Sequence, residues 1–109
     1  MKYGYATLSP MTQRDQILAT LRQHAPELQA AGLDHLRLFG SVSRDEATPA
    51  SDIDILADFS PTKTITLVTL GSFEQRLAKL LGSDVELCSP EWLKPHIRER
   101  ALREAIDVF

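Results

Sequence analysis

Apolar residues recur along the chain at two spacings, which together predict a mixture of helices and strands. Helical spacing appears first after Thr12, whose hydroxyl is suited to cap a helix N-terminus. The apolar face of this helix comprises Ile17, Leu18 and Leu21. Pro26 is expected to end or kink the helix, and one further helical turn is expected before Gly32.

The first strand pattern ends at a glycine. Leu36 and Leu38 alternate with polar neighbours up to Phe39, so we expect a strand that closes at Gly40. A short helix is expected over about residues 42–47, and Pro49 is typical of the loop that would follow it.

Two more strands and two more helices are predicted in the second half of the chain. The strands are Ile53–Phe59 and a short one around Glu86. A helix over residues 65–81 carries leucines at helical spacing, which we expect in the core, and Gly82 stops it. After a helical turn around Trp92, a final helix is expected from Pro95. Its apolar side would hold Ile97, Ala101, Leu102, Ala105 and Ile106.

These elements predict an α/β (α+β) fold in which a small mixed β-sheet is flanked by helices. The 109 residues suffice for one domain with a modest core, which we place at residues 12–109 after an N-terminal arm of residues 1–11. A formal net charge of −3 argues against direct, sequence-independent binding to nucleic acid. No membrane span or signal peptide is predicted, and the lone Cys88 favours a reducing, cytoplasmic setting.

The second predicted strand begins with an unusual pair of acids. Side chains alternate between the two faces of a strand, so Asp52 and Asp54 share one face and Ile53 and Ile55 the other. Two like charges held this close on an apolar strand are costly unless a cation lies between them. Mg²⁺ prefers a few carboxylates, waters and phosphate oxygens.

Three further residues strengthen this interpretation. Gly40 lets the backbone approach a ligand, and Ser41 offers a hydroxyl and an N–H suited to phosphate. Glu86 lies between Val85 and Leu87, so it points away from the core and a neighbouring strand would place it beside the two aspartates. Three carboxylates and a phosphate cradle suit two-metal phosphoryl or nucleotidyl transfer, in which Glu86 or a metal-bound hydroxide could also help deprotonate an acceptor hydroxyl.

Plainer interpretations stay open for several of these residues. Arg44 could contact phosphate or pair with Asp45 or Glu46 on the surface. Ser51 could cap the turn that enters the second strand, and Glu86 could simply face solvent. The remaining polar and aromatic residues receive no site role: the three histidines and the charges of the last helix are expected on the surface, and Cys88 and Trp92 packed.

The pattern of Gly40-Ser41, Arg44, Ser51, Asp52-Ile53-Asp54 and Glu86 resembles the minimal nucleotidyltransferases of the DNA polymerase beta superfamily. The resemblance covers most of the chain, from about Leu33 to the last helix. It implies that Gly40, Ser41, Arg44 and Ser51 bind nucleotide, and that Asp52, Asp54 and Glu86 are catalytic and hold Mg²⁺, with ATP as substrate.

Small stand-alone members of this family are similar to antitoxins of HEPN-type ribonuclease toxins. The resemblance implies transfer of AMP from ATP to a tyrosine of such a partner, contacted through apolar surface on the last helix and around Trp92. Three positions depart from the usual pattern: Glu86 replaces the more common Asp, Asp45 stands where many relatives have Gly, and Val42 replaces a basic residue. Two alternatives therefore stay open: an antitoxin that only binds the toxin, and an adenylyltransferase acting on a small molecule, with a homo-oligomer building the pocket.

Overall fold

A computed structural model describes residues 12–46, 48 and 51–109 of the chain. Four strands form one mixed sheet in the order β3-β2-β1-β4. Strands β1 (Leu33–Phe39) and β2 (Ile53–Phe59) are antiparallel, as are β1 and β4 (Ile106–Asp107), whereas β2 and β3 (Val85–Cys88) are parallel. The mixed sheet of the predicted α+β class is confirmed. The predicted arm of residues 1–11 lies outside the described residues.

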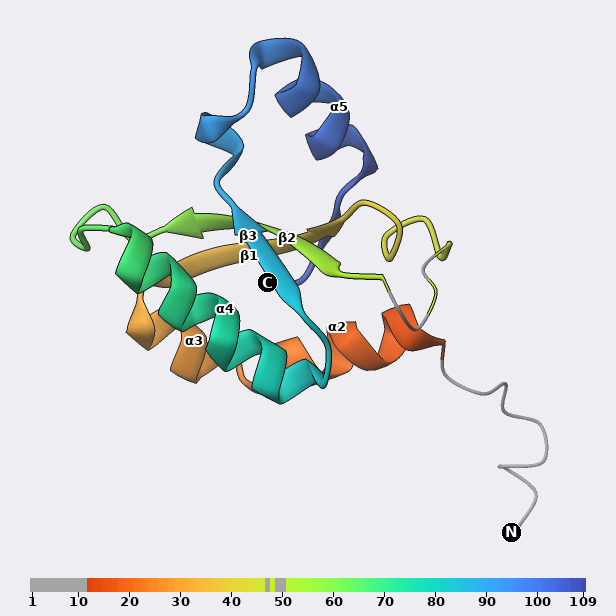
Figure 1. Cartoon of the computed structure of the whole chain (residues 1–109), viewed down its shortest axis with the longest axis horizontal. Coiled ribbons are helices and arrows are strands. Elements are labelled where there is room, and N and C mark those ends of the chain that lie inside the picture. The colour runs from red at the N-terminus through yellow and green to blue at the C-terminus, as the bar shows by residue number, and fades with distance from the viewer. Residues whose placement is uncertain (1–11, 47, 49–50) are drawn as a thin grey trace, which may run out of the picture.

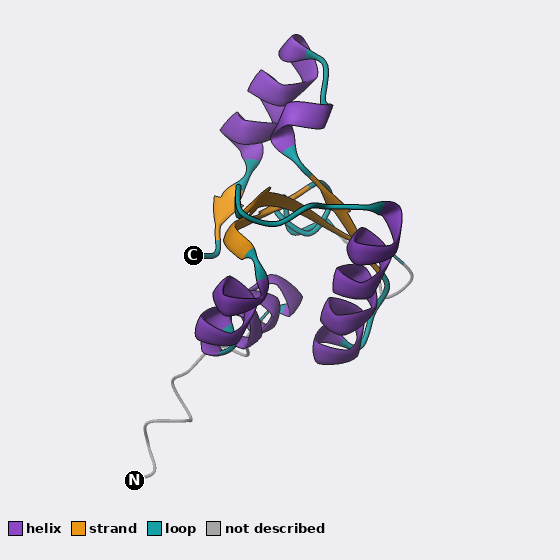
Figure 2. Ribbon diagram, turned by 90° about the vertical axis from the view of Figure 1, so that its left-hand side faces the viewer, coloured by secondary structure: helices purple, strands orange, loops and turns teal. Residues whose placement is uncertain are grey.

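The helices divide between the two faces of the sheet. Helices α2 (Gln13–Gln23), α3 (Ala25–Ala31) and α4 (Leu67–Leu81) cover one face, and α5 (Pro95–Glu104) stands over the other (Figures 1 and 2). The main core lies between the sheet and the first three helices. Its members come from all these elements and include Leu21, Leu28, Leu33, Leu36, Leu38, Ile53, Ile55, Phe73, Leu77, Val85 and Leu87. No helix in the described ranges has both the length and the apolar character needed to cross a membrane.

Local chemistry accounts for where these helices begin and end. The Thr12 hydroxyl accepts a bond from the Asp15 N–H at 3.1 Å, and the Asp15 carboxylate accepts one from the Thr12 N–H at 3.3 Å, which makes a capping box. The first helix ends before Pro26, as predicted, and Gly32 ends α3 at φ 118°. Gly82 ends α4 at φ 70°. Left-handed backbone of this kind is accessible to glycine at little cost.

Three predicted elements or placements are wrong. Residues 42–45 form turns and not a helix, and Asp45 adopts a left-handed φ of 58° that interrupts helical geometry; Ala47 lies outside the described residues. Thr66 caps α4, so the helix begins at Leu67, which is 87% exposed and not in the core. Trp92 is 52% exposed, although its ring stacks on Phe59 at 5.8 Å.

The end of the chain also differs from the prediction. Helix α5 stops at Glu104, and Ile106 begins β4 instead of continuing the helix. The open side of β1 supplies partners for this segment: the Val108 N–H donates to the Leu36 carbonyl at 2.9 Å, and the Leu36 N–H donates to the Phe109 carbonyl at 3.3 Å. Unpaired backbone groups of a strand favour such an addition over another helical turn.

Candidate active site

The three predicted acidic residues lie on neighbouring strands at one end of the sheet. Asp52 immediately precedes β2, Asp54 is its second residue, and Glu86 is the second residue of β3. Parallel pairing places Asp54 directly opposite Glu86. The alternation predicted from sequence is confirmed, because the flanking Ile53 and Val85 are 1% and 9% exposed on the core face. We call Asp52, Asp54 and Glu86 the acid trio.

Gly40 lies directly against the acid trio. It follows Phe39, which pairs with Asp54 across β1 and β2, and it adopts φ 75°. A Cβ at this position would stand 2.6 Å from the Asp54 Oδ2 atom, closer than real side-chain contacts allow. The close approach of Gly40 to a ligand stays a prediction; in the structure the immediate neighbour of this glycine is the Asp54 carboxylate.

A compact turn carries Gly40 and Ser41. The Ser41 carbonyl accepts a bond from the Glu46 N–H at 2.8 Å, and the Gly40 carbonyl accepts one from the Arg44 N–H at 3.3 Å. The Ser43 hydroxyl, only 6% exposed as a residue, donates to the same Gly40 carbonyl at 2.8 Å. We call residues 40–46 the Gly40 turn.

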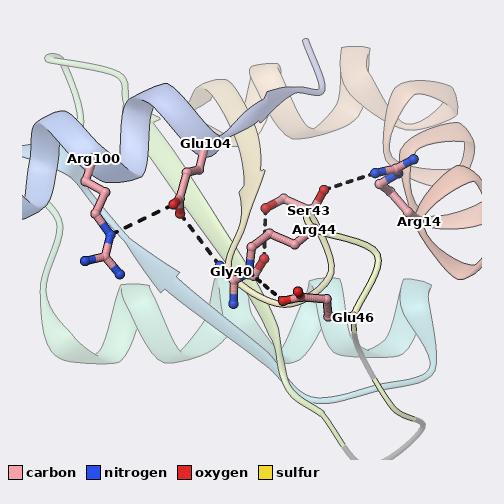
Figure 3. A network of polar contacts seen from close by, with 7 residues as sticks. All are labelled: Arg14, Gly40, Ser43, Arg44, Glu46, Arg100 and Glu104. Carbon is pink, nitrogen blue, oxygen red and sulfur yellow. Dashed lines mark hydrogen bonds and ion pairs between the residues drawn. The ribbon is translucent and has the colours of Figure 1, made fainter.

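Helix α2 anchors the Gly40 turn from the other side. The Arg14 Nη1 atom donates to the Ser43 carbonyl at 3.1 Å (Figure 3). Neither Arg14 nor Ser43 was expected at the site. The sequence shows Ser43 as a second serine in Gly-Ser-Val-Ser, but gives no indication of a contact from Arg14 across 29 positions.

The electrostatics of the acid trio are unfavourable without a cation. Burial raises the pKa of Asp54 above its ordinary value, and the charges of Glu86 and Asp52 raise it further, while Arg44 opposes the change. A carboxylate crowded by like charges is typical of functional sites. A divalent cation between these groups would relieve the repulsion.

The acid trio fits Mg²⁺ in donor type. Its oxygens are the hard ligands that Mg²⁺ prefers, and an ion that keeps several waters needs only one or two carboxylates at first contact. Within the described residues, no three Asp, Glu, His or Cys side chains converge as a ready-made metal cage. Three carboxylates without a cation repel one another, so we expect the side chains of the acid trio to rotate toward the ion when Mg²⁺ binds.

Arg44 and Ser51 make the contacts that were expected if neither residue binds nucleotide. Arg44 forms ion pairs on the surface, and Ser51 accepts a bond just before the second strand. The Arg44 Nε atom lies 2.7 Å from the Glu46 carboxylate, and its Nη1 atom lies 3.7 Å from that of Glu104. These neighbours raise the pKa of Arg44, with the Glu46 hydrogen bond as the main cause. The Ser51 hydroxyl accepts a bond from the Thr48 N–H at 3.0 Å and so closes a turn before Asp52. Arg44 nevertheless belongs to the Gly40 turn and lies close enough for its charge to act on Asp54.

A cavity of about 370 Å³ opens between the Gly40 turn and α5. We call it the α5 cavity. It is lined by Phe39, Gly40, Arg44, His96, Ile97, Arg100, Ala101 and Glu104. The α5 residues were expected to form a solvated helix face on one side and apolar packing or a partner-contact surface on the other, and none of them was predicted to bind nucleotide or metal. Their spacing of 96, 97, 100, 101 and 104 is that of one helical side, and this regularity was the available indication.

Comparison with known proteins identifies the family of this chain. A family model described as a nucleotidyltransferase domain matches residues 17–108. The protein adenylyltransferase MntA of Thermococcus cleftensis is 35% identical over 99 residues, which are 90% of this chain and 98% of that protein. A solved structure provisionally described as a minimal nucleotidyltransferase matches with a TM-score of 0.72 and 35% identity, covering 91% of this chain and 98% of that one.

A crystal structure of a toxin–antitoxin with AMP-PNP matches with a TM-score of 0.62 and 25% identity, covering 88% of this chain and 72% of the matched chain. The resemblance drawn from the Gly-Ser and Asp-x-Asp motifs is confirmed by these matches, which extend over both the sheet and the helices. The chain therefore belongs to the nucleotidyltransferase domain family, as a minimal nucleotidyltransferase.

Proposed function

We propose that the protein transfers AMP from ATP to a tyrosine of a HEPN-type toxin and acts as its antitoxin. The observation that carries the proposal is the row Phe39–Asp54–Glu86 across the sheet, with Gly40 packed on the Asp54 carboxylate. This row places the proposed phosphate cradle and the proposed metal ligands at one end of the molecule. The relative named a protein adenylyltransferase and the toxin–antitoxin structure with AMP-PNP support this choice of donor and acceptor.

Each residue of the site has a role in this reaction. Gly40 and Ser41 would hold the phosphates through backbone N–H groups, and Arg44 would exchange an acidic partner for a phosphate oxygen. Asp52, Asp54 and Glu86 would hold Mg²⁺, which supplies charge neutralisation for the polyphosphate when it is bound. The tyrosine oxygen forms a bond to the α-phosphorus, the bond to the bridging oxygen breaks, and pyrophosphate leaves. The phenol proton passes to water or to a carboxylate of the acid trio.

The test is to incubate the purified chain with ATP, Mg²⁺ and a HEPN-type toxin, and to measure the intact mass of the toxin. We expect a gain of one or more AMP units. Asp54→Asn should lower the rate by about 100-fold or more, because a lost metal ligand removes several kcal/mol of transition-state stabilisation. Peptide mapping by tandem mass spectrometry then identifies the modified residue.

Asp58→Asn is the matched control, since it makes the same change on β2 at a residue that pairs with Arg37 at 3.2 Å. It should keep the wild-type rate. A stable complex with the toxin but no mass gain would reject the transfer reaction in favour of an antitoxin that acts by binding. Full transfer by both Asp54→Asn and Asp52→Asn would reject the assigned site.

A further inference from the structure

The α5 cavity has walls of two different chemical kinds. Phe39, Ile97 and Ala101 supply apolar surface from opposite sides, the first from the end of β1 and the other two from α5. Apart from Gly40, the remainder consists of charged or titratable residues: Arg44, His96, Arg100 and Glu104. Ligand pockets are mostly apolar with a few polar groups that fix orientation, and they range over roughly 300–1,000 Å³. The cavity of about 370 Å³ meets this description.

The α5 cavity is continuous with the site already described. Gly40 lines the cavity and also contacts the Asp54 carboxylate. Arg44 lines it too, and its charge acts on Asp54. A ligand whose phosphates lie at the Gly40 turn would therefore place the part attached to them at the mouth of this cavity.

Glu104 lies within ion-pair distance of the two cavity arginines. Its Oε2 atom lies 3.7 Å from the Arg44 Nη1 atom, and its Oε1 atom lies 3.9 Å from the Arg100 Nε atom. Figure 3 shows Arg100 and Glu104 descending from α5 toward Arg44 and the Gly40 turn. One carboxylate thus links the helix over the sheet to the turn beneath it. Arg100 is 74% exposed in its side chain, so its planar guanidinium is available to a ligand.

We propose that the α5 cavity binds the nucleoside part of ATP, an inference that rests on the function proposed above. The base lies against Ile97 and Ala101, and the guanidinium of Arg100 stacks on its exposed face. Nucleobases commonly stack on arginine planes and apolar side chains, because each presents a flat or weakly hydrated surface. An inorganic polyphosphate has no group that would use this surface, which makes it the natural comparison ligand.

The test measures the affinity for ATP and for inorganic tripolyphosphate, each with Mg²⁺, by titration calorimetry. Ala101→Leu adds bulk where the residue is 8% exposed and lines the cavity. ATP affinity should fall by about tenfold or more, whereas tripolyphosphate affinity should stay within about twofold of wild type. Ala19→Leu makes the same change on the exposed side of α2 and should alter neither affinity.

A second pair of variants keeps the inference testable if Ala101→Leu fails to fold. Arg100→Ala should weaken ATP by about three- to tenfold and leave tripolyphosphate unchanged. Arg103→Ala is the control, because Arg103 is also on α5 and pairs with Glu99 at 3.4 Å but does not line the cavity. Equal losses for both ligands in Arg100→Ala would assign the cavity to the polyphosphate and overturn the inference.

The outcomes also separate this inference from the proposed function. If Ala101→Leu and Arg100→Ala bind ATP like wild type while AMP transfer proceeds, only the nucleoside pocket is rejected. If the wild-type protein binds neither ATP nor tripolyphosphate with Mg²⁺, the proposed function fails and this inference fails with it.

Discussion

Two glycines with almost the same φ angle differ in what surrounds them. Gly40 and Gly82 have φ values of 75° and 70°. A Cβ on Gly40 would meet the Asp54 carboxylate at 2.6 Å, whereas a Cβ on Gly82 would meet nothing within 4 Å. The pair therefore separates backbone strain from a steric effect on the acid trio.

We expect Gly40→Ala to lose most of its AMP transfer and to reduce the free energy of unfolding by about 1–2 kcal/mol, since the added methyl displaces Asp54. Gly82→Ala should lose about 1 kcal/mol through backbone strain alone and keep its activity. Toxin mass spectrometry and urea denaturation give the two readouts. Wild-type transfer by Gly40→Ala would show that the Asp54 position is not constrained by this turn.

The positions of site residues were predictable from sequence only where they depend on the geometry of a single strand. Strand alternation sufficed to place Asp54 and Glu86 on the face opposite the core. Arg14, His96 and Arg100 were not predictable in the same way, because their places depend on how distant elements pack around the Gly40 turn. Pairing of β2 with β3 was expected only as one arrangement that would bring the acids together.

At the scale of elements, the last fifteen residues show how tertiary pairing overrides local pattern. Their helical spacing runs through Ile106, but the structure ends α5 at Glu104 and pairs Ile106–Asp107 with β1. The guanidinium of Arg22 fixes this ending from α2: its Nε atom donates to the Val108 carbonyl and its Nη2 atom to the Asp107 carbonyl, both at 2.9 Å. Periodicity within one segment contains no information about such a contact across 86 positions.

Arg22→Ala should therefore lower the free energy of unfolding by about 1–2 kcal/mol, because two charge-assisted bonds to backbone carbonyls are lost. Arg103→Ala removes only an exposed i,i+4 pair with Glu99 and should cost less than about 0.5 kcal/mol. Chemical denaturation of both variants measures the difference. Equal costs would mean that β4 is held by its strand pairing alone.

At the scale of the whole molecule, the sheet separates stability from chemistry. Its covered face carries the core beneath α2, α3 and α4, while the acid trio and the α5 cavity lie on the other face. The raised pKa of Asp54 shows that this second face is electrostatically strained. The free energy gained by packing the core therefore holds together three carboxylates that repel one another.

This strain predicts a pH dependence of unfolding. Because the pKa of Asp54 is raised in the folded state, its contribution to stability is present below the ordinary value of 3.8 and is lost as the pH rises through the raised pKa. At pH 7 without divalent cations, Asp54→Asn should melt at a higher temperature than wild type. The difference should close as the pH falls below 3.8.

Addition of Mg²⁺ should raise the melting temperature of wild type and leave Asp54→Asn almost unchanged. Asp58→Asn is the control, because it removes the ion pair between Asp58 and Arg37 and should therefore not raise the melting temperature. A lower melting temperature for Asp54→Asn at pH 7 in the absence of cations would contradict the assigned electrostatics.

The lengths of the four strands have a consequence for self-association. Both outer strands are short, with four residues in β3 and two in β4, against seven in each inner strand. A long apolar strand at the edge of a sheet can pair with a strand of another chain. Short edge strands offer few unpaired backbone groups for such pairing. The two segments most able to seed fibrillar assembly, Leu33–Phe39 and Ile53–Phe59, are thus enclosed within the sheet. The folded protein should resist amyloid-like aggregation for as long as its brief terminal strand remains docked.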